Sequence, residues 1–357
     1  MLQLYYKAAM GVGLAITTGT AVAFLLLNHN LYSALFTLSA MIFGMRLSAT
    51  CYDFFQLKLW SGIYALIMCY GAFLVLYWQG ESFSYVGFCL IGLTLPGFLV
   101  TLPGNLTINW FGSLKAPVLG IIWSISIATG LLLRIAISIF SYKLLLLWFP
   151  LLVSCCLFLL QKFPVNYLDG HKKSGTLNSG KKAGAIIFFF CTTICSSLVL
   201  RLLFDANDTT ASGSFSILFF GGLLLFPLLF SFFIDRKGAF SGCVLVIFLS
   251  ECSILAEVLY DLSALQRLVP FLAGAVATAP TVLCPLLTYY LFGPGGYNKR
   301  LSHISLSIPS AYFVSFLIPL EKGGPTFAVY LIIGMLLFSF AAVFSAWRHR
   351  LVLLKSS

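Results

Sequence analysis

The sequence predicts an all-α polytopic membrane protein, in which twelve transmembrane helices form two six-helix, pseudo-symmetric bundles. Three observations predict this class. The chain of 357 residues is 60% hydrophobic and only 9% charged, whereas an ordinary globular chain carries about 25% charged residues. Its polar gaps divide it into apolar segments that are each long enough to cross a bilayer. A short motif in the first half of the chain recurs in the second half.

The apolar segments number twelve, and six lie on each side of a longer polar stretch. A spanning helix needs roughly 20 apolar residues, because each residue adds about 1.5 Å and the hydrocarbon core is about 30 Å thick. The segments of the first half cover residues 8–27, 31–51, 59–78, 84–103, 116–138 and 142–162. Those of the second half cover residues 184–204, 214–234, 240–259, 268–292, 301–320 and 325–347. We therefore predict an N-terminal bundle (1–163), a cytoplasmic linker (164–183) and a C-terminal bundle (184–357).

An internal repeat indicates that the two halves are copies of one unit. The motif L-T-x-x-x-F-G occupies residues 106–112 and 287–293, which are 181 positions apart (293 − 112 = 181). Asp53 and Asp235 have nearly the same separation (235 − 53 = 182), and each lies in a short polar gap. Many transporters build a central site between two membrane repeats of this kind.

The basic residues indicate the orientation in the membrane. With the N-terminus placed inside, two basic residues, Arg267 and Lys322, fall in outer gaps. By the positive-inside rule both termini are cytoplasmic, in a plasma membrane or a bacterial inner membrane. The net charge of +11 is then topological, and we expect no nucleic-acid partner. The inner gaps and tails hold Lys7, Lys58, Lys115, Lys172, Lys173, Lys181, Lys182, Arg236, Lys237, Lys299, Arg300, Arg348, Arg350 and Lys355.

A short loop in the second half carries the most specific family signal. Residues 231–238, S-F-F-I-D-R-K-G, enter the gap after the eighth apolar segment. They resemble the loop signature G-x-x-x-D-R-x-G of the major facilitator superfamily, with Ser231 in the first small position. The corresponding loop of the first half, residues 51–58, keeps Asp53 but lacks the arginine and the glycine. The six-plus-six layout and the basic central stretch are also similar to this superfamily.

The resemblance implies a transporter whose halves rock about a central cavity and expose it to each side in turn. It implies gating roles for Asp53, Asp235, Arg236 and Gly238. An acid beside a helix N-terminus can hold neighbouring helices in one of two arrangements, and a glycine permits the sharp turn. The fourth segment, 84–103, has no arginine, although many proton-coupled members of the superfamily carry one there.

Polar residues at helical spacing suggest which helix faces line this cavity. The resemblance implies that helices one, four, seven and ten approach it. Three of these helices carry small polar residues three or four positions apart, which places the residues on one face. The alternative is close helix packing, with each hydroxyl bonded to its own backbone. The candidate cavity residues are Thr17, Thr20, Thr193, Ser197, Thr278 and Thr281.

Ionisable residues inside the membrane are the other candidates. Glu251 lies roughly 17 Å into the ninth segment at about 1.5 Å per residue. Charge at that depth costs several kcal/mol, so we consider a proton-coupling group and, alternatively, a structural carboxyl bonded between helices. Arg201 and Glu257 lie near the outer interface, where their ion pair would form an outer gate. The alternative for Arg201 is that its side chain reaches toward the lipid headgroups.

Signatures of enzymes and cofactors are absent from the sequence. There is no H-E-x-x-H or G-x-S-x-G motif, and the four histidines are scattered, so we predict neither an enzyme nor a metal site. Residues 175–182 resemble a phosphate-binding loop. Because Lys182 replaces the hydroxyl that would hold magnesium, we expect no nucleotide cofactor.

The sequence therefore predicts a secondary active or facilitative transporter of a small polar or zwitterionic organic solute, with an amino acid favoured. The expected partners are that solute, the lipid bilayer and a co-transported proton or other ion. Two alternatives stay open at this stage. One is a non-transporting receptor or scaffold with a transporter fold, and the other is a membrane-embedded, lipid-modifying enzyme.

Overall fold

The computed structural model describes most of the apolar segments. The described residues form helices joined by short turns. The sixth predicted segment, 142–162, lies outside them. They are residues 31–54, 57–77, 81–111, 114–139, 179–207, 213–258, 263–293, 297–318 and 330–345, with positions 11, 12, 16, 18, 19 and 21.

The fourth predicted segment is longer than the sequence indicated, because it continues beyond residue 103 to Phe111. Its middle is a π-helix, in which the Leu102 N–H donates to the Gly97 carbonyl five residues earlier. Pro96 and Pro103 lack an N–H, and the wider turn between them keeps the rod continuous. The helices of the first half are α2 (Leu31–Phe54), α3 (Leu57–Tyr77), α4 (Glu81–Pro96), η1 (Gly97–Thr101), α5 (Leu102–Phe111) and α6 (Lys115–Ile139).

The second half also departs from the predicted boundaries at two places. Its first helix begins at Ser179, inside the stretch predicted as linker. The eleventh segment is interrupted at Leu306, since Pro309 has no N–H to bond the Ser305 carbonyl. The helices are α8 (Ser179–Asn207), α9 (Gly213–Lys237), α10 (Ala239–Val258), α11 (Ser263–Phe292), α12 (Tyr297–Ser305), α13 (Ser307–Leu317) and a final helix, Tyr330–Ser345.

Several of these helices are long and apolar enough to cross a membrane. Within the described residues five qualify by length and composition, and three further apolar helices are shorter. All of them coincide with predicted segments. The five are Ser82–Ile108, Lys115–Leu133, Gly180–Val199, Leu218–Lys237 and Leu268–Phe292.

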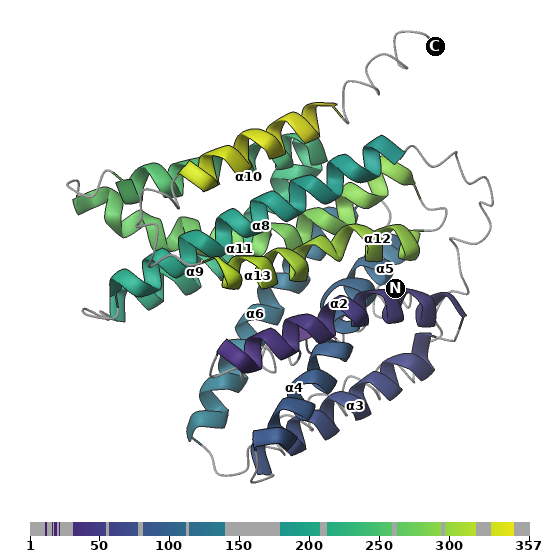
Figure 1. Ribbon diagram of the computed structural model, residues 1–357. Helices are drawn as coiled ribbons and strands as arrows, with labels where there is room; N and C mark the ends of the chain where they lie inside the picture. Colours follow the sequence, from purple (N-terminus) through teal and green to yellow (C-terminus); the bar gives the residue numbers. More distant parts are fainter. Residues whose placement is uncertain are drawn as a thin grey trace, which may run out of the picture.

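The helices gather into two bundles that lie side by side (Figure 1). One bundle contains α2 to α6, drawn in purple and blue, and the other contains α8 to α13 with the final helix, drawn in teal to yellow. The main contacts between the bundles are those of α6 with α9 and of α2 with α12 and α13. A single buried apolar core continues across this boundary.

Close glycine contacts are equivalent in the two bundles. A Cβ atom on Gly92 of α4 would collide with the Thr37 carbonyl of α2, and one on Gly274 of α11 would collide with the Phe219 carbonyl of α9. The two members of each contact are displaced by the same number of positions (274 − 92 = 182 and 219 − 37 = 182). The internal repeat seen in the sequence is thus also a repeat of helix packing.

Candidate functional site

Basic side chains gather at one end of the molecule, which we call the basic end. It is the end at which α5, α9 and α11 finish and at which α6, α8 and α12 begin. The sequence predicts that it faces the cytoplasm. Its residues are Lys115, Lys181, Lys182, Arg236, Lys237, Lys299 and Arg300.

The two bundles meet tightly near the basic end. The Ser305 hydroxyl of α12 donates to the Met45 sulfur of α2 at 3.2 Å, and both residues are buried. On α5, a Cβ atom on Gly104 would lie 3.2 Å from side-chain atoms of Pro285, Tyr297 and Leu301. These contacts bring the two bundles into close packing at this point.

A lysine–tyrosine contact joins the bundles at the same end. The Lys115 ammonium, at the start of α6, lies 3.8 Å from the ring centroid of Tyr289 and 5.3 Å from that of Tyr290. The charge of Asp235, in the last turn of α9, acts on both Lys115 and Tyr290. Lysine over an aromatic face is attracted by the ring quadrupole. The contact therefore links α6 of the first bundle to α11 of the second.

The two copies of the repeated motif meet at this contact. Lys115 follows the first copy by three positions, and Tyr289 and Tyr290 lie inside the second copy. Sequence reasoning counted Lys115 only as a topological charge and missed its contact. The signal that could have found it is the repeat, because equivalent helix ends of two pseudo-symmetric bundles face each other across the axis between them.

The predicted gating loop has the turn that its glycine allows. Gly238 has φ +86° and donates its N–H to the Ile234 carbonyl at 2.7 Å. Asp235 and Arg236 are exposed in the last turn of α9. Asp53 lies in the last turn of α2, but its side chain is outside the described residues.

The predicted cavity residues divide into three groups. Thr17 and Thr20 lie outside the described residues. The hydroxyls of Thr278 and Thr281 donate to carbonyls of their own helix, as packing alone would require. Thr193 is buried, and its hydroxyl has no hydrogen-bond partner in the described structure.

Ser197 and Arg201 attach α8 to α13. The hydroxyls of Ser197 and Ser315 are 2.6 Å apart. The Arg201 guanidinium donates to the carbonyls of Ser315 and, at 3.0 Å, of Ile318. Arg201 thus binds the C-terminal carbonyls of a neighbouring helix. The side chain of Glu257, its predicted gate partner, is outside the described residues.

Glu251 does not lie among packed helices, as its depth in the membrane suggested. Its side chain is exposed on α10. It shares one helix face with Val244 and Phe248, which are also exposed. Its role as a coupling group stays a prediction.

The π-helix η1 carries two buried polar contacts that the sequence did not reveal. The Thr18 hydroxyl of the first segment donates to the Phe98 carbonyl at 3.2 Å. The hydroxyls of Ser48 and Thr101 are 3.1 Å apart. A π-helix turn leaves carbonyls without their usual partner and is frequent at functional sites. These bonds connect three helices of the first bundle at its central rod.

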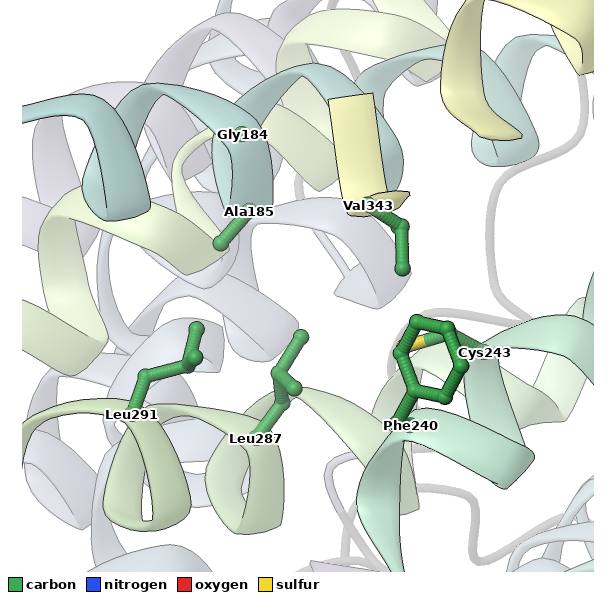
Figure 2. Close-up of a pocket in the computed structure, with 7 residues that line it drawn as sticks. All are labelled: Gly184, Ala185, Phe240, Cys243, Leu287, Leu291 and Val343. Atoms are coloured by element: carbon green, nitrogen blue, oxygen red, sulfur yellow. The ribbon is translucent and has the colours of Figure 1, made fainter. Parts of the chain in front are cut away.

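Two small cavities lie within the second bundle. One is surrounded by apolar groups of Gly184, Ala185, Phe240, Cys243, Leu287, Leu291 and Val343 (Figure 2). Its volume of about 20 Å³ is enough for one water molecule at most. The other, of about 10 Å³, lies beside Ser196, Ser250 and Ser253. Neither is large enough for an organic solute.

Comparisons with known proteins support the architecture through structure alone. No family model matches the sequence, and no curated protein matches it. Among solved structures, the E. coli fucose:proton symporter aligns with a TM-score of 0.70 at 13% identity, over 96% of this chain and 98% of that one. The chain has the fold of this transporter.

A second solved structure has the same fold. A bacterial homologue of the iron transporter ferroportin, in its outward-facing state, aligns with a TM-score of 0.63 at 13% identity, over 96% of this chain and 99% of that one. The chain therefore shares the fold of both solved transporters, which is the fold that the sequence predicted. The chain is an all-α, multi-pass membrane protein with two pseudo-symmetric bundles.

Proposed function

We propose that this protein is a secondary active or facilitative transporter that moves a small polar or zwitterionic organic solute by alternating access. The observation that carries the proposal is the closed contact between the bundles at the basic end. Its polar contacts among the described residues are those of Ser305 with Met45 and of Lys115 with Tyr289 and Tyr290, and they lie beside the close packing of Gly104. Contacts of this number and kind can separate at a cost of a few kcal/mol.

The helix pairs between the bundles supply the surface on which the rocking occurs. On α6, a Cβ atom on Gly120 would collide with Ser231 and lie 2.5 Å from the Pro227 carbonyl of α9. Such contact between backbones allows two helices to rotate against each other without long side chains between them. The arrangement resembles a hinge on one side of the molecule.

The proposed solute class rests on the buried polar groups of α8 and α11, among which hydroxyls predominate. Thr193 has a buried hydroxyl with no partner in the described structure, so a solute group that bonds to it would remove a desolvation cost. Amino acids are the first solutes to test, because they are small and zwitterionic.

The energy source is the second part of the proposal. One of the similar structures is named a proton symporter, and Glu251 is the candidate proton carrier of this chain. Its exposed position does not connect it to the boundary between the bundles through described contacts. If Glu251 couples transport to protons, Glu251→Gln will abolish accumulation driven by a pH gradient while exchange of labelled solute continues. Unchanged accumulation in this variant would contradict coupling through Glu251.

Uptake into proteoliposomes tests the transport function. The purified full-length chain would be offered a panel of labelled amino acids, sugars and organic acids, with and without a pH gradient, and empty liposomes would be the control. We expect saturable uptake of at least one solute of the proposed class. Saturable binding with no flux would indicate a receptor, and conversion of a lipid without flux would indicate an enzyme; either result overturns the proposal.

A further inference from the structure

A pair of basic side chains lies in direct contact near the basic end. The Lys182 ammonium of α8 is 2.9 Å from Nδ1 of His303 on α12, and both side chains are partly buried. An ammonium has no acceptor, so it donates to the ring, and the ring keeps its proton on Nε2. The ammonium keeps its remaining N–H groups as donors, and the ring presents its own N–H on the side away from Lys182.

Further positive charge surrounds this pair. Arg46 of α2 and Lys299 of α12 both act electrostatically on the His303 ring, as does Lys182. Arg46 and Lys299 are exposed. Within the described part of the chain, none of these cations forms an ion pair with an acid. The four residues form a group that we call the basic cluster, and it draws on both bundles.

The helix ends add to the positive potential. Lys182 lies in the first turn of α8, and Lys299 lies in the first turn of α12. A helix N-terminus carries partial positive charge, which disfavours cations and attracts anions. The three charged groups, Arg46, Lys182 and Lys299, repel one another, and an anion among them would relieve that repulsion. The setting is therefore suited to a multiply charged oxyanion.

We propose that the basic cluster of Arg46, Lys182, Lys299 and His303 is a binding site for a phosphate group. Arginine and lysine bind phosphate oxygens through charge-assisted hydrogen bonds, and the His303 Nε2–H is a further donor. The predicted position at the cytoplasmic membrane surface suits the phosphate of an anionic lipid headgroup. A free phosphate compound from the cytoplasm has the same chemistry.

Binding at this site would favour closure of the basic end. Arg46 belongs to the first bundle and the other three residues to the second, and α2 packs directly on α12. An anion shared between them would hold the two bundles together. This consequence rests on the proposed transport function, whereas the binding site itself does not.

Thermal unfolding of the full-length protein measures the binding. The protein would be placed in nanodiscs of phosphatidylcholine. The midpoint temperature of its unfolding would then be compared with and without added phosphatidylglycerol, inorganic phosphate or glycerol phosphate, at constant ionic strength. We expect the midpoint to rise with at least one of these probes. A rise with phosphatidylglycerol alone identifies a lipid site, and a rise with the soluble probes identifies a free phosphate site; both support the proposal.

Substitutions separate a built site from general surface charge. Arg46→Gln and Lys182→Gln should each weaken the apparent affinity about fivefold. Lys237→Gln, at an exposed lysine of the same end, is the matched control and should change it little. No midpoint shift in the wild-type protein, or an equal loss in the control, would overturn the proposal. So would an affinity that appears only in Asp53→Asn, because a carboxylate of the chain would then occupy the cluster.

Discussion

At the scale of single residues, the boundary between the bundles depends on contacts of two kinds. One is the contact of the Lys115 ammonium with the Tyr289 and Tyr290 rings, and the other is direct backbone approach at glycines. The first kind has a modest energy and is easily broken. The second kind tolerates no added side chain. A transporter needs both, since its bundles must separate at one end while they stay packed along the helices that rotate.

Lys115→Met tests the contact of the Lys115 ammonium with the tyrosine rings. The substitution keeps a long side chain but removes the charge over the two rings, so we expect the basic end to open more often. A cation over an aromatic ring contributes about 0.5–2 kcal/mol, and amide exchange in α5 and the start of α6 should therefore accelerate about two- to thirtyfold. Hydrogen–deuterium exchange with mass spectrometry measures this. Lys237→Met is the control, and an equal acceleration in both variants would contradict a specific role for Lys115.

Gly120→Ala tests the direct approach of helix backbones at glycines. The added Cβ atom would collide with Ser231 and Pro227 of α9, so we expect a loss of about 1–3 kcal/mol in the free energy of unfolding. Gly62→Ala is a matched control, because nothing lies within 4 Å of a Cβ atom there. That control should be neutral or slightly stabilising. Equal stability of the two variants, measured by denaturant titration in micelles, would show that α6 and α9 are not in close contact.

At the scale of helices, apolar length predicts where the elements lie but not where they are interrupted. The apolar helices long enough to cross a membrane overlap predicted segments, because the bilayer demands a run of about 20 apolar residues. Proline effects could not be predicted in the same way. Pro96 and Pro103 are accommodated by a π-helix, whereas Pro309 leaves one backbone bond missing where α12 passes into α13 at Leu306. The outcome depends on whether neighbouring groups bond the released carbonyls.

Arg201 makes a contact between two helices, and the sequence did not identify its partner. The pairing with Glu257 was predicted from charge, whereas the structure adds bonds to the carbonyls at the end of α13. Backbone acceptors are present at every residue, so a sequence does not single them out. The same applies to Ser197, whose partner Ser315 lies on a helix far away in the chain.

Arg201→Met measures how strongly this contact fixes α13. Loss of charge-assisted bonds to two carbonyls should lower the free energy of unfolding by about 1.5–3 kcal/mol. If α13 is held by the carbonyl contacts alone, Glu257→Gln will leave the stability unchanged. An equal loss in Glu257→Gln, with no further loss in the double variant, would instead support the predicted ion-pair gate. Denaturant titrations of the three variants distinguish the two results.

At the scale of the whole molecule, the duplication links the sequence to the fold. The offset of about half the chain length appears in a sequence motif, in the two loop acids and in the glycine contacts of α2 with α4 and of α9 with α11. The fold could therefore be predicted from the sequence. The site could be predicted only in part, because the solute contacts depend on how two bundles face each other, and helical spacing within one segment carries no information about that.

The most direct test of alternating access is a pair of distance measurements in one membrane preparation. Spin labels at Thr50 and Ser241 report the basic end across the two bundles, and labels at Tyr77 and Leu268 report the opposite end. In a cysteine-free background, we predict two populations at each end, with the basic end opening when the opposite end closes as solute is added. A single unchanged distance at both ends, with every solute and gradient that supports flux, would contradict a rocking transporter.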